Sequence, residues 1–228
     1  MGDPIATLIE NTNEVQNLVK AHVRMTGSHP GRRYGVEILN KSGIVMLTAC
    51  WEAFVEDTAS IAYEALIEKS ADYRTLPEEV LKKVAKWIKE DRHELKVWSL
   101  AGEGWRAVLR DYKVMMLNKY IGPFHNPRAG NIDNLFKDLI GVISVSDKWR
   151  WPGMTPQKAK DKLSEYIALR GAIAHRVKAS KKVHKRTVIK YAIFINYLAV
   201  LTANMTTRYI QSLVGVNPWA HYTYKSIN

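Results

Sequence analysis

The chain has 228 residues, of which 46% are hydrophobic and 25% charged, a composition that supports a buried core and excludes an intrinsically disordered protein. Its single cysteine, Cys50, excludes an intramolecular disulfide and a zinc site built from several cysteines, and it fits a reducing cytoplasm. The formal net charge is +12, and residues 148–190 hold 13 basic and 2 acidic side chains, whereas residues 1–147 hold 19 basic and 20 acidic ones. Such a concentrated basic segment is typical of a polyanion-binding surface, although a solvated basic helix has the same composition.

The first half of the chain has the spacing of helices. Residues 4–24 carry apolar side chains three and four residues apart, which predicts an amphipathic helix, and a loop with glycine and proline follows at residues 27–31. A long helix is expected over about residues 34–70, with Trp51, Phe54 and Val55 on one face and Glu52 and Glu56 one turn apart beside it. The next helix begins with Pro77-Glu78-Glu79, which places proline in the first turn and acids at the positive end of the helix dipole.

The second half continues in the same way. Residues 99–104 interrupt the pattern, a helix is expected over 105–121, and Asn131 is expected to cap a helix that runs to about residue 142. Thr155-Pro156 predicts the start of a helix that ends near residue 176, and a lysine-rich connector leads into a last helix over about 186–214. Since no strand pattern or repeat is present, we predict an all-α fold, an antiparallel helical bundle in a single domain.

Two expectations concern membranes and metals. The uncharged stretch between Lys190 and Arg208 contains two asparagines and three threonines, so we expect a buried core helix and no membrane partner. The first residues do not combine a charged start with an apolar stretch, so we expect no signal peptide. The sequence has no glycine-rich phosphate loop and no histidine pair at metal-binding spacing, so we expect neither a metal ion nor a cofactor. Cys50 lies in an apolar stretch and is expected to be a small buried side chain rather than a nucleophile.

One pattern remains that carries chemistry. Arg170 and His175 enclose only glycine, alanine and isoleucine, lie within the basic segment, and are followed at once by Arg176. Five residues along a helix correspond to about 140° of rotation, so the two side chains meet only if the long arginine bends back over its small neighbours. A structural alternative stays open, in which Arg170 pairs with Glu52 or Glu56 and the histidine caps the last carbonyls of its helix.

The sequence LRGAIAHR (169–176) resembles the R-x4-6-H motif of HEPN domains, small all-α bundles common in prokaryotic defence and toxin systems. Three further segments resemble the RiboL-PSP-type HEPN group in the same order: TACWEAFVED (48–57), WSLAGEGW (98–105) and NPRAGNIDNLFKDLIGV (126–142). The resemblance covers roughly residues 34–180. We therefore divide the chain into an N-terminal helix and loop (1–33), a core with the motif (34–180), and a basic connector with the C-terminal helix (181–228).

The resemblance implies a metal-independent endoribonuclease in which the motifs of two subunits of a homodimer form one composite site, with Arg170 and His175 as the catalytic residues. The position after the arginine is often polar in active members, and here it is Gly171. The chemistry is consistent with the residue types: RNA supplies its own nucleophile, histidine transfers protons near neutral pH, and arginine binds phosphate oxygens through a planar fork. We expect products that end in a 2′,3′-cyclic phosphate, and no cleavage of DNA.

Further basic residues are expected to bind the RNA backbone: Arg176, Lys178, Lys181, Lys182, Lys185 and Arg186. Trp149, Trp151 and Tyr166 are expected to stack on unpaired bases, although for the two tryptophans partial burial against the bundle is the simpler interpretation. The predicted protein is a cytoplasmic toxin or defence effector, a homodimer that binds RNA and is controlled by a neutralising or regulatory protein partner. Two alternatives stay open: a non-catalytic module that binds RNA or nucleotides, and, less favoured, a helical DNA-binding protein.

Overall fold

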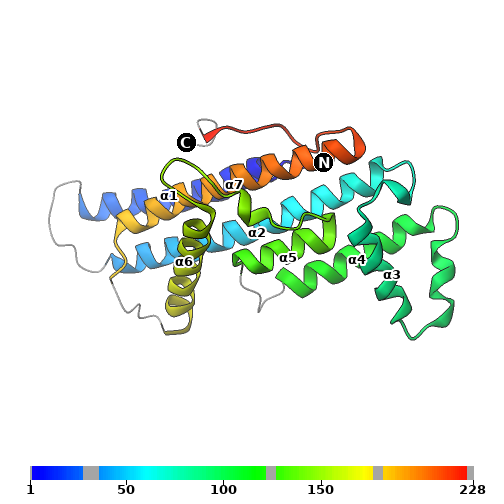
Figure 1. Cartoon of the computed structure of the whole chain (residues 1–228). Helices are drawn as coiled ribbons and strands as arrows, with labels where there is room; N and C mark the ends of the chain where they lie inside the picture. Colours follow the sequence, from blue (N-terminus) through cyan, green and yellow to red (C-terminus); the bar gives the residue numbers. More distant parts are fainter. Residues whose placement is uncertain (1, 28–35, 122–126, 177–181, 225–228) are drawn as a thin grey trace.

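Seven α-helices and three short 3-10 helices make up the described part of the computed structural model, which comprises residues 2–27, 36–121, 127–176 and 182–224 (Figure 1). The helices are α1 Pro4–Thr26, α2 Glu37–Lys69, η1 Tyr73–Thr75, α3 Glu78–Lys89, η2 Glu94–Leu100, α4 Gly104–Ile121, α5 Ala129–Ile140, η3 Val145–Lys148, α6 Pro156–Arg176 and α7 Lys185–Val214. Extended pairing in these ranges is confined to one isolated bridge between Trp151 and Met154. The prediction of an all-α fold is confirmed.

Helix α2 is the centre of the bundle and packs against α1, α4, α5, α6 and α7. Figure 1 shows α1, α2 and α7 lying along one another, with α1 antiparallel to the other two, while α6 crosses this layer. The apolar face predicted for α2 is confirmed, because Trp51, Phe54 and Val55 are all buried. This face holds the other helices in place, since burial of each large apolar side chain contributes about 1.5–3 kcal/mol.

Helices α2 and α7 are long and apolar enough to cross a membrane, and half of the apolar window of each is buried inside the bundle. The polar groups of α7 also find partners within the protein. Thr202 accepts a hydrogen bond from the indole N–H of Trp149, and Thr207 donates to the carbonyl of Trp219. This packing fits the core helix that the sequence predicts.

The start of α5 differs from the prediction. The helix begins at Ala129, Arg128 occupies the cap position without a side-chain hydrogen bond, and Asn131 lies inside the first turn. The prediction that Asn131 caps this helix is therefore wrong. The physical reason is tertiary burial: Ala129 and Ile132 both contact the core, and this packing favours a helix that starts before the asparagine.

Candidate functional site

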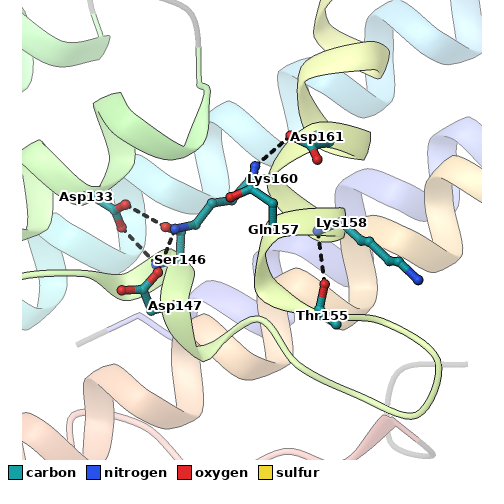
Figure 2. A network of polar contacts seen from close by, with 8 residues as sticks. All are labelled: Asp133, Ser146, Asp147, Thr155, Gln157, Lys158, Lys160 and Asp161. Carbon is teal, nitrogen blue, oxygen red and sulfur yellow. Dashed lines mark hydrogen bonds and ion pairs between the residues drawn. The ribbon is translucent and has the colours of Figure 1, made fainter.

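The site predicted from the sequence lies on α6, and the first turns of this helix are fixed by polar contacts to its neighbours (Figure 2). Asp133 of α5 accepts hydrogen bonds from the backbone N–H and the hydroxyl of Ser146 in η3, at 2.8 and 2.5 Å. The next residue of η3, Asp147, forms an ion pair at 2.6 Å with the ammonium group of Lys160 on α6. Thr155 accepts a hydrogen bond from the backbone N–H of Lys158, which confirms the predicted start of this helix at Thr155-Pro156.

The middle of α6 is held by aromatic side chains against α7. The ring of Tyr166 is stacked on that of Tyr191, with ring centroids 3.9 Å apart, and the Tyr191 hydroxyl is hydrogen-bonded to Thr48 of α2 at 3.0 Å. The ammonium group of Lys162 lies 4.9 Å from the ring centroid of Phe194. Tyr166 is buried, so the prediction that it stacks on RNA bases is wrong.

Arg170 lies one turn after Tyr166 and is half-buried between α6 and the central helix. Its positive charge lowers the pKa of Glu52 on α2, although burial is the larger effect and the pKa of that carboxyl is raised overall. The same charge acts on Tyr191 of α7. No hydrogen bond or ion pair joins the guanidinium to another described side chain. The structural alternative proposed that Arg170 pairs with Glu52 or Glu56. Arg170 is close enough to Glu52 to act on its pKa, but the two side chains form no direct ion pair.

His175 is exposed near the end of α6, and no described contact joins it to Arg170. This is the result of helical geometry, because five residues place the arginine toward α2 and the histidine toward solvent. Between them, Ile173 is buried, but the space beside Gly171 is open: a Cβ atom added there would meet no atom within 4 Å. Within one chain, the two motif side chains are therefore separate groups on the same helix end.

A family model described as RiboL-PSP-HEPN matches residues 6–206 of this sequence. The chain belongs to the RiboL-PSP-HEPN family. Comparisons with curated proteins and with solved structures returned no match. The matched region is wider than the 34–180 that the motifs suggested, since it begins in α1 and ends in α7, so both of these helices are part of the HEPN match.

The basic residues after the motif are only partly described. Lys182 and Arg186 are exposed and Lys185 is half-buried, whereas the side chain of Arg176 and both Lys178 and Lys181 lie outside the described residues. The connector is attached to the start of α2 at the backbone of Val183. Its carbonyl accepts a hydrogen bond from the amide of Asn40 at 2.9 Å, and its N–H donates to the carboxylate of Glu37 at 3.4 Å.

The two tryptophans before α6 belong to the structure of the HEPN bundle. Trp149 is fully buried, lies edge-on to Trp51 with centroids 6.0 Å apart, and donates its indole N–H to Thr202 at 2.9 Å. Trp151 is half-buried and its ring is stacked on that of Tyr197 at 4.8 Å. The stacking role considered for Trp149 is therefore wrong, and the simpler interpretation, burial against the bundle, holds for it.

The structure also contains a group of polar residues near Glu52 that the sequence did not predict. Glu52, Tyr120 and Asn131 line a cavity of about 10 Å³, which is about the room that one water needs. The Tyr120 hydroxyl donates a hydrogen bond of 2.8 Å to Asp138, a buried carboxylate that also lies 3.4 Å from the ammonium group of Lys83. These residues come from α2, α3, α4 and α5, so no spacing in the sequence could have linked them.

The described residues contain no group of three or more His, Cys, Asp or Glu side chains arranged to hold a metal ion. Cys50 is buried, as predicted, and burial raises the pKa of its thiol, which disfavours the thiolate that a nucleophile requires. The groups able to act on a phosphodiester in this region are thus a half-buried guanidinium with a carboxylate near it and an exposed imidazole.

Proposed function

We propose that this HEPN domain is a metal-independent endoribonuclease that cleaves RNA at a composite site formed by two copies of the chain. The observation that carries the proposal is the state of Arg170: a half-buried guanidinium without a hydrogen bond to a described side chain, near exposed His175, in a segment with 13 basic and 2 acidic residues. A half-buried guanidinium that forms no ion pair with a described carboxylate is suited to a phosphate ligand.

The roles follow from the chemistry of the groups. Arg170 would bind the non-bridging phosphate oxygens, where negative charge accumulates in the transition state, and Glu52 would orient the guanidinium from the side of α2. A histidine takes the proton of the ribose 2′-OH as this oxygen attacks phosphorus, and the departing 5′-oxygen receives a proton. The products are a 2′,3′-cyclic phosphate and a 5′-hydroxyl, and DNA is not cleaved because it lacks the nucleophile.

Two copies are invoked because one chain supplies one histidine, five residues from the arginine and directed away from it. A two-fold axis near the exposed end of α6 would place the histidine of one subunit close to the arginine of the other. The small residues Gly171, Ala172 and Ala174 allow two such helix ends to approach closely. Each of the two symmetric sites then contains one arginine and one histidine from different chains; the imidazole accepts the proton of the 2′-OH, and water protonates the departing 5′-oxygen.

The test is cleavage of tRNA and mRNA in EDTA by wild type, Arg170→Ala and His175→Ala. We expect each variant to lose activity, by roughly 10²–10⁴-fold for the histidine. Arg92→Ala and His93→Ala are matched controls, because both side chains are exposed just before η2, far along the chain from the motif. Undiminished cleavage by either motif variant would show that the site is assigned wrongly.

The composite site has its own test. We expect a mixture of Arg170→Ala and His175→Ala chains to recover activity, because a mixed dimer contains one site with both side chains intact. Unmixed preparations at the same total concentration are the control. If mixing restores nothing while dimers form, the two residues act within one chain.

A second candidate function is a non-catalytic RNA- or nucleotide-binding module, and Gly171 favours it because the space beside Arg170 lacks the polar side chain common in active members. It is distinguished by salt-sensitive RNA binding without any product on long incubation. If the nuclease is active, we propose that it acts in the cytoplasm as a toxin or defence effector, under the control of a protein partner. Growth arrest on expression, absent for His175→Ala, is the expected readout.

A further inference from the structure

A groove between α1 and α7 lies outside the proposed nuclease site. It encloses a cavity of about 280 Å³, and its apolar lining includes Val15 and Val19 of α1 and Val188, Ala192 and Ile193 of α7. The two helices lie side by side along the long layer of the bundle (Figure 1). Val188 is buried directly above Gly43 of α2, so the bottom of the groove is closed by the central helix.

The apolar lining continues onto the open surface of α7. Ile189 and Ile193 are 40% and 44% exposed, and they lie one turn apart on the side of α7 that faces the groove. Exposed isoleucines next to a concave apolar surface are typical of a protein-binding site rather than of a solvated helix face. The geometry, a groove between two helices, is suited to the apolar face of a third helix.

The charges around this groove have one sign. Lys20 of α1 lines it, and none of the described lining residues is acidic. On α7, Arg186 and Lys190 are exposed and precede Ile189 and Ile193 by three residues each, so they lie on the same side of the helix. None of these three cations forms an ion pair with a described carboxylate, so their charge is available to a partner.

We propose that the α1–α7 groove binds an acidic amphipathic helix of a protein partner, with apolar side chains over Val19 and Ile193 and carboxylates against Lys20, Arg186 and Lys190. The positive charges around the groove favour a partner with negative charge, and the concave apolar lining favours a helix with an apolar face. Unpaired bases bind stacking platforms, and the described lining contains no aromatic residue. The apolar lining is mainly concave, with only Ile189 and Ile193 exposed at its edge, and this shape fits a helix better than a membrane surface.

The test uses a fluorescein-labelled peptide of about four helical turns, roughly 15 residues, with leucines three and four residues apart and glutamates at most other positions. Fluorescence anisotropy with the full-length protein measures its binding. We expect binding that weakens with salt, at least about tenfold weaker binding of a peptide with serine in place of leucine, and none of a lysine counterpart. Absence of binding by the acidic peptide, or equal binding by the serine peptide, would overturn the proposal.

Variants of the protein locate the binding surface. Ile193→Ser, and separately Lys20→Glu with Lys190→Glu, should each weaken binding by about tenfold or more. Val114→Ser and Lys89→Glu are the controls, since both side chains are exposed on other helices and should leave affinity within about twofold. Thermal melts confirm that each variant is folded, and Ile189→Ser provides a second apolar variant. Equal loss in test and control variants would overturn the assignment.

Competing ligands complete the design. Poly(U) RNA and vesicles of phosphatidylglycerol with phosphatidylcholine are tested against wild type and Ile193→Ser; binding of either that depends on Ile193, without binding of the peptide, would reassign the groove. The inference does not depend on ribonuclease activity. Arg170→Ala should bind the peptide as wild type does whether or not the wild type cleaves RNA, so the two proposals fail separately.

Discussion

The buried pair of Trp149 and Thr202 allows a quantitative test of how the segment between η3 and α6 is held against α7. The indole N–H donates to the threonine hydroxyl at 2.9 Å, and both side chains are fully buried. Replacing one partner leaves the other without its hydrogen bond inside the buried core. The pair also separates two roles for the tryptophan, because a residue that stacks on RNA would contribute to binding rather than to stability.

The magnitude follows from these contacts. Trp149→Phe removes the donor and should lower the free energy of unfolding by about 2–4 kcal/mol, of which about 1–3 kcal/mol comes from the unpaired hydroxyl and the rest from the smaller ring. Thr202→Val keeps the shape and should cost about 1–3 kcal/mol, because it leaves the indole N–H unpaired. In the double variant neither group is left unpaired, so the two effects should fall short of additivity by about 1 kcal/mol or more.

The assay is urea unfolding followed by far-UV circular dichroism for all four proteins of the cycle. For a chain of this size the single tryptophan variant should melt roughly 5–15 °C below wild type. RNA affinity, measured at one salt concentration, should be unchanged for the fraction that is folded. An unaltered melting temperature with weaker RNA binding, or strictly additive effects in the cycle, would refute the reasoning.

Three further predictions concern single positions. Gly171→Ala should raise the free energy of unfolding by about 0.5–1 kcal/mol in chemical denaturation, because the position is helical and a Cβ there meets no atom within 4 Å. Gly141→Ala should lower it by more than about 1 kcal/mol in the same assay, since its φ is +80° and the new Cβ would lie 2.6 Å from Pro77. Burial raises the pKa of Glu56, so folding favours the protonated form and the ionised form weakens the fold. Glu56→Gln should therefore raise the melting temperature at pH 7, and this gain should vanish below about pH 4, where the carboxyl is protonated in both states.

Much of the fold followed from local patterns. The apolar spacing predicted α1 and the buried face of α2, Thr155-Pro156 predicted the start of α6, and Pro77 predicted the start of α3. These features depend on residues within one or two turns of each other, so a single sequence contains the information. The prediction for Asn131 was wrong because burial of its neighbours outweighed the preference of one side chain for a cap.

The candidate site was predicted only in its local part. The motif Arg170–His175 is visible as a sequence because it lies on one helix, and its spacing already implied that the two side chains diverge. The positions of Glu52, Tyr120 and Asp138 relative to one another depend on how four helices pack. Residues so far apart in the sequence are not related by helical spacing, so the sequence pattern could not predict that they meet.

The sequence alone thus determined that the chain is helical, where its basic charge is concentrated, and which pair of residues carries the family motif. Only the tertiary structure decided which side of each helix is covered. It buried Trp149 and Tyr166, left Arg170 half-exposed near Glu52, and formed an apolar groove with basic residues around it between α1 and α7. The physical reason is that helical periodicity is a local property, whereas burial and the electrostatic environment depend on packing between segments distant in the chain.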